Sequence, residues 1–187
     1  RAFSECFDEV LYNEMDPALA SAAEHNFEAL GVKNIRVLNM ETAPSTLASI
    51  LGGFKPDIIF LDPARRSSAG KKVFLLEDCR PDVLALLPGL LSACRHLLLK
   101  LSPMADIQLV TERLNRTYER FLEKDDGSGW NGRWVREVHV VSSGGECKEL
   151  LVWMDREWNG GYSLICREDG NIMEFTDTEV SGSAATY

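Results

Sequence analysis

The most constraining feature of this sequence is a pair of short, almost wholly apolar runs at residues 57–61 (DIIFL) and 96–101 (HLLLKL). Continuous apolar runs of this length are typical of strands that are covered on both faces. A helix is expected between them at residues 82–91, interrupted by Pro88 and Gly89. Strands that alternate with helices at this spacing predict an α/β fold with a mostly parallel, doubly wound sheet and right-handed crossovers.

The N-terminal part follows the same alternation. Residues 10–12 and 35–38 are short apolar runs that predict strands. Asp16 and Pro17 are typical of a helix N-cap followed by proline at the first helical position. The helix that starts there should end at Gly31, and a shorter helix at residues 45–51 should end at the glycine pair that follows it.

The pattern changes after about residue 120. Residues 105–114 predict a helix, whereas residues 123–133 are polar and glycine-rich and predict a loop. Residues 135–141 and 149–154 then predict two strands of an antiparallel hairpin that closes the sheet, joined by the turn-like sequence SSGGE. We therefore expect one domain over residues 1–157, with residues 158–187 forming a tail or the start of a small C-terminal module.

Composition excludes several classes of protein. The five cysteines are an odd number and include no C-x-x-C pair, which argues against a disulfide framework or a zinc site and predicts no metal. No apolar run approaches the ~20 residues of a membrane span, so a cytoplasmic protein with no membrane partner is expected. The net charge of −9 gives no diffuse attraction for nucleic acid, so an RNA partner would need a local basic patch.

Ligands of open α/β sheets bind at the carboxyl ends of the strands, so candidate site residues are sought there. Glu14 and Met15 follow the first predicted strand. A carboxylate at this position can accept hydrogen bonds from both ribose hydroxyls of an adenosyl group, and Met15 can cover the adenine. The alternative is that Glu14 only interacts with the dipole of the helix that begins at Pro17.

Asp62 and Pro63 follow the strand at residues 57–61. A proline directly after a buried strand ends the strand and turns the chain over the ligand crevice, where Asp62 can reach a ligand or a substrate amino group. Arg65 and Arg66 follow, and with two nearby lysines they form a candidate patch for substrate phosphates. The alternatives are an ordinary strand-ending turn and a solvated charged loop.

The strand at residues 96–101 contains Lys100 and is followed by Ser102 and Pro103. A partly buried lysine needs a carboxylate or a ligand as its partner, and Lys100 is given no catalytic role. The three histidines are scattered through the sequence and indicate no metal site or catalytic triad.

The order of these motifs resembles that of class I S-adenosylmethionine-dependent methyltransferases that modify RNA. The resemblance rests on YNEMDPALASAAEHNFEALGVKNIRVLNMETA followed by DIIFLDPARR, and covers roughly residues 1–158. The closer similarity is to bacterial methyltransferases with a THUMP-like C-terminal domain, which carry DPARR, a K-x-S-P-M segment and a G-E-x-K-E segment.

The resemblance implies S-adenosylmethionine as the cofactor, a Rossmann-like sheet and an RNA substrate. It places Glu14 on the ribose, Met15 and Glu41 by the adenine, and Asp62 by the methyl group. The first strand and the glycine-rich loop of the family are missing, because Glu14 leaves no room for a motif that normally lies about 20 residues before this acid.

Two further departures from the family bear on the chemistry. Ala64 replaces the second proline of the D-P-P motif, and an arginine follows where amino-group methylases carry an aromatic residue. Ser102 stands near the position at which C5-uracil methylases carry their nucleophilic cysteine, and an unactivated hydroxyl is a far weaker nucleophile than a thiolate. Methylation of an exocyclic amine is therefore left open, and C5 chemistry through residue 102 is rejected.

Two other functions are weighed against a methyltransferase. A catalytically inactive Rossmann-like module that supports an RNA-binding domain is favoured by the missing loop and the acidic charge. A nicotinamide oxidoreductase would also carry an acidic residue at the end of a strand, as Glu14 does here. It would not explain the antiparallel hairpin or the sequence DPAR at residues 62–65. The sequence leaves open the substrate nucleotide, the methylated atom and the oligomeric state.

Overall fold

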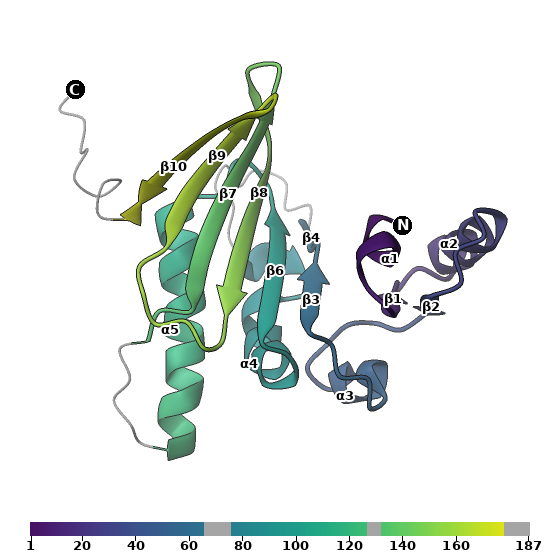
Figure 1. The fold of residues 1–187 in the computed structure, drawn as a ribbon. Helices are drawn as coiled ribbons and strands as arrows, with labels where there is room; N and C mark the ends of the chain where they lie inside the picture. The colour runs from purple at the N-terminus through teal and green to yellow at the C-terminus, as the bar shows by residue number, and fades with distance from the viewer. Residues whose placement is uncertain (66–75, 127–131, 178–187) are drawn as a thin grey trace. The chain divides into compact units, whose positions relative to one another are not determined.

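The computed structural model describes residues 1–65, 76–126 and 132–177. It divides into two compact units, Arg1–Phe54 and Lys55–Tyr187. The helices and strands of both units are labelled in Figure 1.

The first unit confirms the elements that the sequence predicts there. Its elements are α1 (Ala2–Cys6), β1 (Val10–Asn13), α2 (Pro17–Ala29), β2 (Ile35–Leu38) and α3 (Leu47–Leu51). Strands β1 and β2 form a parallel pair in which Val10 lies beside Ile35 and Asn13 beside Leu38. The carboxyl ends of both strands therefore lie at the same edge.

The ends of α2 follow from local chemistry. The Asp16 carboxylate accepts hydrogen bonds from the amides of Ala18 (2.8 Å) and Leu19 (3.2 Å), and so satisfies two of the free N–H groups at the helix start. The chain leaves the helix at Gly31, whose φ of +68° is the left-handed conformation that favours glycine. The predicted cap and the predicted stop are both confirmed.

The second unit contains the larger sheet and the longer helices. Its elements are β3 (Ile58–Leu61), β4 (Ala64–Arg65), the 3-10 helix η1 (Leu76–Asp78), β5 (Cys79–Arg80), α4 (Val83–Ala93), β6 (His96–Leu101), α5 (Ile107–Asp126), β7 (Val135–Ser143), β8 (Glu146–Asp155), β9 (Ser163–Glu168) and β10 (Asn171–Thr176). The main sheet has the order β10-β9-β7-β8-β6-β3, and β4 pairs with β5 separately.

The main sheet is mixed, so the prediction of a mostly parallel sheet is wrong. Of its five pairings among the described residues, β3–β6 and β7–β9 are parallel, whereas β6–β8, β7–β8 and β9–β10 are antiparallel. The reason is the position of β8, which runs antiparallel between β6 and β7. Strands that are consecutive in sequence and joined by tight turns pair antiparallel, and here two such pairs follow the last long helix.

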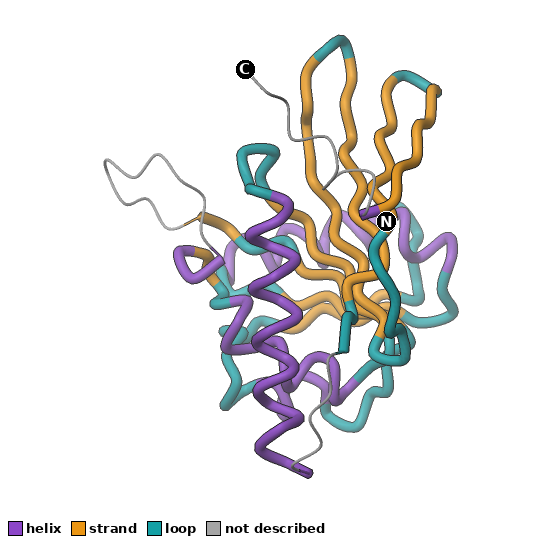
Figure 2. Tube along the Cα trace, turned by 90° about the vertical axis from the view of Figure 1, so that its left-hand side faces the viewer, coloured by secondary structure: helices purple, strands orange, loops and turns teal. Residues whose placement is uncertain are grey.

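The sheet continues beyond β7 and β8. Strand β9 pairs with β7, and β10 forms the edge. The turns 144–145 and 169–170 lie at the same end of the sheet (Figure 2), and the Asp169 carboxylate joins them by accepting hydrogen bonds from the Ser143 hydroxyl (2.9 Å) and the Gly144 amide (3.1 Å). The predicted domain boundary after residue 157 stays a prediction, and the described strands beyond it extend the same sheet.

The core of the second unit lies between the sheet and two helices. Helices α4 and α5 pack against each other and lie behind the sheet in the view of Figure 1. Burial alternates along β6: Leu97, Leu99 and Leu101 are buried, and the residues between them are half-buried. This period of two is that of a strand with one well-covered face. The uniform burial expected for this apolar run is therefore not observed.

The two helices are longer or more continuous than predicted. Helix α4 runs through Pro88 and Gly89 without a break, because buried leucines on one of its faces hold it against the core. Helix α5 extends to Asp126, so residues 123–126 are helical rather than part of the predicted loop. No helix in the described ranges combines the length and the apolar character that a membrane span requires.

A buried carboxylate joins β8 to the start of β6. Asp155, only 1% exposed, accepts two hydrogen bonds from the Arg95 guanidinium (2.9 and 3.0 Å) and one from the Glu157 amide (3.0 Å). Arg136 lies 3.5 Å from the same carboxylate. Because this charge is buried, its partners are needed to offset the loss of hydration.

Candidate functional site

Parallel strands β3 and β6 bring the two predicted strand-end motifs of the second unit to one edge. Their register pairs Ile58 with His96 and Leu61 with Leu99. Asp62 follows the last residue of β3, and Lys100 is the next residue of β6 after Leu99. The carboxyl edge of the sheet thus carries a carboxylate and an ammonium group on neighbouring strands, at the position where open α/β sheets bind ligands.

These groups form a three-residue charge cluster. The Lys100 Nζ lies 2.7 Å from the Asp62 Oδ2 and 3.8 Å from the Glu149 Oε1. The Lys100 side chain is 30% exposed, whereas those of Asp62 and Glu149 are about half exposed at 51% and 44%. The carboxylates are accessible, and the ammonium group between them is the more protected partner. We call these three residues the strand-end cluster.

Glu149 reaches the strand-end cluster because the β7–β8 hairpin is longer than β6. The pairing of β6 with β8 ends at Leu101 opposite Leu150, whereas the pairing of β7 with β8 continues to Ser143 opposite Glu146. The hairpin therefore overhangs the carboxyl edge of β6 and places Glu149 beside it. The sequence predicts the hairpin strands but does not predict this overhang.

The electrostatics of the strand-end cluster keep Lys100 protonated. Its pKa is raised, chiefly by the hydrogen bond to Asp62, while burial opposes the shift and the charges of Asp62 and Glu149 add to it. A protonated ammonium cannot act as a proton acceptor, but it can fix the position of a carboxylate. The prediction that Lys100 has a carboxylate or a ligand as its partner is confirmed, and the partner is the Asp62 carboxylate.

Pro63, which follows Asp62, is buried. The next two residues form β4, which pairs antiparallel with β5, so that Ala64 lies opposite Arg80 and Arg65 opposite Cys79. The chain therefore turns into a short second sheet directly after the cluster. The backbone of Arg65 is described but its side chain is not, and Arg66 lies outside the described residues.

In the first unit, Glu14 follows β1 and is half-buried. Its amide donates to the Leu38 carbonyl (3.0 Å), and its Oε1 accepts a hydrogen bond from the Asp16 amide (2.9 Å). Burial, followed by the charge and hydrogen bond of Glu14, raises the pKa of Tyr12. A carboxylate has about four acceptor sites, so these contacts leave Glu14 able to accept further hydrogen bonds.

Met15 and Glu41 are also placed by β1 and β2. Met15 is 48% exposed directly after Glu14. Asn13 is the last residue of β1, and its side chain donates hydrogen bonds to the Met40 carbonyl and to the Thr42 hydroxyl, both at 3.0 Å. These bonds hold the residues on either side of Glu41, which is exposed. Glu14, Met15 and Glu41 therefore all follow the carboxyl ends of this strand pair.

Two other types of site can be compared with the structure. The Ser102 Oγ accepts a hydrogen bond from the Met104 amide (3.2 Å), which is a local turn contact and does not activate the hydroxyl. No group of three or more His, Cys, Asp or Glu side chains in the described part of the chain is arranged to hold a metal ion.

Comparison with known proteins gives structural rather than sequence relatives. No family model matches the sequence, and no curated protein matches it. Among solved structures, a putative methyltransferase from Porphyromonas gingivalis W83 is similar over 96% of this chain, with a TM-score of 0.68 and 28% identity. The similarity covers 41% of that protein, so this chain spans about two fifths of its length.

A triple mutant of Spodoptera frugiperda DNMT2 shows a weaker likeness, with a TM-score of 0.45 and 11% identity over 87% of this chain and 48% of that protein. The first similarity establishes the fold class. The chain has an α/β fold with a mixed sheet that resembles the Rossmann-like fold of a methyltransferase.

Proposed function

We propose that this chain belongs to an S-adenosylmethionine-dependent methyltransferase that acts on RNA. The observation that carries the methyltransferase part of the proposal is the similarity to the structure of the putative methyltransferase from Porphyromonas gingivalis over 96% of the chain. RNA as the substrate rests on the order of the sequence motifs alone. A shared fold alone does not fix a reaction, so the residues at the strand ends must also suit the cofactor and the chemistry.

The residues of the first unit suit an adenosyl group. Glu14 retains acceptor capacity for ribose hydroxyls, and the exposed Met15 offers an apolar surface for a planar base. In the proposal, Glu14 holds the ribose, and Met15 and Glu41 lie by the adenine. S-adenosylmethionine, when bound, supplies an electrophilic methyl group on a sulfonium.

The strand-end cluster suits the acceptor side of a methyl transfer. Methyl transfer to a nucleophile needs mainly proximity and alignment, with a group that accepts a hydrogen bond from the attacking N–H or O–H. Asp62 is half exposed and can accept this hydrogen bond. Lys100 holds the carboxylate at 2.7 Å, and Pro63 fixes the turn after it. We assign substrate phosphates to Arg65 and Arg66.

Calorimetric titration of S-adenosylhomocysteine into the complete gene product that carries this chain tests the cofactor. We expect binding that the Glu14→Ala variant weakens by about tenfold or more, because hydrogen bonds to a charged group contribute ~1.5–3 kcal/mol and each 1.4 kcal/mol is a factor of ten.

The matched control is Glu24→Ala, which removes an exposed carboxylate from α2 and should leave the affinity unchanged. If the unsubstituted protein binds no S-adenosylhomocysteine, the methyltransferase proposal is wrong. The non-catalytic binding module would then take its place. Equal losses from both variants would remove Glu14 from the cofactor site.

A further inference from the structure

Helix α5 carries a row of three arginines on one face. Arg113, Arg116 and Arg120 are three and four residues apart, the spacing that places side chains on the same side of a helix. Given the helical rise of ~1.5 Å per residue, the row extends over about 10 Å. All three are exposed. We call this row, with Thr117 beside it, the arginine face.

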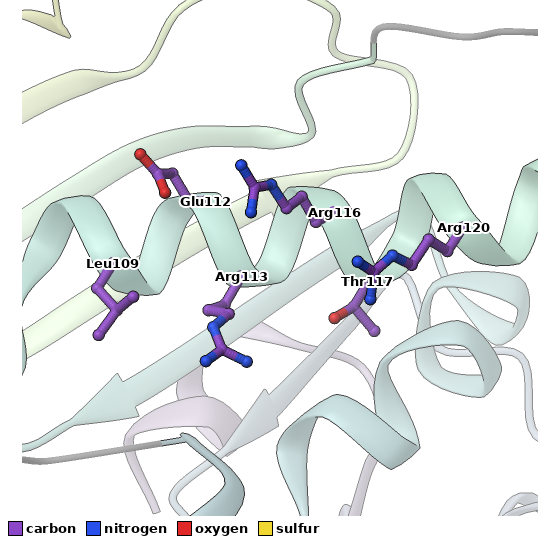
Figure 3. A pocket seen from close by; sticks show the side chains of 6 residues that line it. All are labelled: Leu109, Glu112, Arg113, Arg116, Thr117 and Arg120. Carbon is purple, nitrogen blue, oxygen red and sulfur yellow. The ribbon is translucent and has the colours of Figure 1, made fainter.

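The arginine face lines a groove. Its volume is about 400 Å³, and Figure 3 shows the side chains that line it: Leu109, Glu112, Arg113, Arg116, Thr117 and Arg120. Three guanidinium groups and one carboxylate give this lining an excess of positive charge. The chain as a whole has a net charge of −9, so the groove has the opposite sign to the protein that carries it.

The positive charge of the arginine face is only partly compensated. The Arg113 Nη1 lies 2.6 Å from the Glu77 Oε1. Arg116 and Arg120 have no carboxylate within ion-pair distance among the residues that the structure describes. The Glu112 carboxylate accepts a hydrogen bond from Gln108 (3.4 Å). Two guanidinium groups are therefore available to an external anion.

The opposite face of α5 is fixed in the fold. Leu114 and Tyr118 are buried, and the Tyr118 ring packs edge-on against Trp134 with 4.9 Å between the ring centroids. The Asn115 Oδ1 accepts hydrogen bonds from the amides of Trp134 (2.9 Å) and Val135 (3.2 Å), and so ties the helix to β7. The arginines thus project from a rigid scaffold at a fixed spacing.

We propose that the arginine face binds the phosphate backbone of RNA. This deepens the proposed function and rests on it for the choice of RNA as the ligand. Planar guanidinium groups bind phosphate oxygens through paired hydrogen bonds, and several of them in a row on one helix suit a polymer with repeating phosphates. A membrane surface fits less well, because the apolar face of α5 is buried in the fold and cannot insert into lipid.

The test measures, by fluorescence anisotropy, how tightly the complete gene product binds a fluorescein-labelled 20-nucleotide oligouridine. The measurement is repeated between 50 and 200 mM KCl, because the affinity of phosphate contacts falls with salt in proportion to their number. The variant is Arg116→Gln with Arg120→Gln. The control is Arg36→Gln with Arg167→Gln, which removes the same charge from exposed positions on β2 and β9.

We expect the Arg116/Arg120 variant to raise the Kd about tenfold and to lower the slope of log K against log salt by about 1.4, because two phosphate contacts to a single strand are lost. The control should change the Kd by no more than about twofold. It should change the slope by less than about 0.7, the value expected for one phosphate contact to a single strand. Circular dichroism establishes that each variant is folded.

Three outcomes would overturn the proposal: no binding of the oligouridine at 50 mM KCl, equal effects of the two double variants, or tighter binding to phosphatidylserine vesicles than to RNA. The calorimetric titration of S-adenosylhomocysteine separates this proposal from the proposed function. RNA binding through Arg116 and Arg120 without cofactor binding would support the arginine face and contradict the methyltransferase. The reverse result would contradict the arginine face alone.

Discussion

At the scale of single residues, the strand-end cluster combines two residues that the sequence marks with one that only the fold brings to them. Asp62 is marked by its position between an apolar strand and a proline. Lys100 is marked as a residue that needs a partner, because a lysine in an apolar strand is costly without one. Glu149 carries no such signal, because its role depends on how far β8 extends beyond β6.

The charge of Asp62 is expected to be essential for methyl transfer. Asp62→Asn keeps the shape of the side chain, but it replaces one acceptor oxygen with an NH2 donor and removes the negative charge that pairs with Lys100. We expect transfer of labelled methyl groups to total RNA from a strain lacking the gene to fall about a hundredfold or more. Binding of S-adenosylhomocysteine should change little.

Asp57→Asn is the control for this substitution, because Asp57 is an exposed carboxylate next to the other end of the same strand. It should retain the activity of the unsubstituted protein. Full activity of Asp62→Asn would show that Asp62 takes no part in the reaction.

The buried carboxylate of Asp155 predicts a pH-dependent stability. Burial by itself raises the pKa of Asp155, but the hydrogen bonds from Arg95 and from the Glu157 amide, with the nearby positive charges, lower it overall. The folded-state pKa then lies below the unfolded value of about 3.9, so the stabilisation is present above about pH 4 and is lost as the pH falls further.

The Asp155→Asn variant should therefore unfold with a free energy about 2–3 kcal/mol lower than the unsubstituted protein at pH 7, because Arg95 loses its buried charged partner and keeps only the more exposed Glu157. Urea unfolding between pH 7 and pH 3 measures the difference, which should shrink below about pH 4. A difference that does not vary with pH would contradict this account of the pKa.

At the scale of elements, the sequence predicts which segments are helical or extended better than where they end. The apolar run at 96–101 and β6 coincide, because both its length and its flanking residues are distinctive. Helix α4 is predicted to be interrupted at Pro88, yet it is continuous, since the packing of its buried leucines outweighs the local preference of proline and glycine. Local patterns cannot report the strength of such packing.

Pro88 therefore costs stability that a substitution can recover. It has no N–H to donate to the Leu84 carbonyl one turn earlier. Pro88→Ala restores this donor, and we expect the free energy of unfolding to rise by about 1–2 kcal/mol once the greater freedom of the unfolded chain is included.

Urea unfolding measures this gain. Gly89→Ala, at the exposed neighbouring position of the same helix, provides the comparison and should give a smaller gain of about 0.5–1 kcal/mol. A lower stability of Pro88→Ala would show that the proline ring makes packing contacts that outweigh the hydrogen bond.

At the scale of the whole molecule, the α/β class is predictable from the sequence, but the order of the strands in the main sheet is not. The alternation of strands and helices up to α5 predicts parallel neighbours, and β3 with β6 confirms it. After α5 the short turns predict antiparallel pairs, but no local signal says that β8 rather than β7 lies beside β6, or that β9 runs parallel to β7. These choices depend on contacts between residues far apart in sequence.

The two units also differ in how much apolar surface they bury. Among the described residues, only Ala20 and Ile50 are buried apolar side chains of the first unit, and the rest of the buried core belongs to the second. The sequence does not reveal this asymmetry, because the apolar spacing of α2 resembles that of a well-buried helix. The spacing of apolar residues indicates which face of a helix can pack against the core. Only the fold shows whether that face is buried.

The overhang of the β7–β8 hairpin has an evolutionary consequence. Glu149 faces Lys100 from a strand segment that extends past the core, and the residues before it in β8 are exposed. Substitutions at such surface positions usually change stability by less than about 0.5 kcal/mol. Mutations can therefore accumulate there without loss of the fold, and those that add or remove a charge alter the electrostatic surroundings of the strand-end cluster. Within this architecture, the hairpin is the part whose surface charge can change in descendants while the parallel strands stay the same.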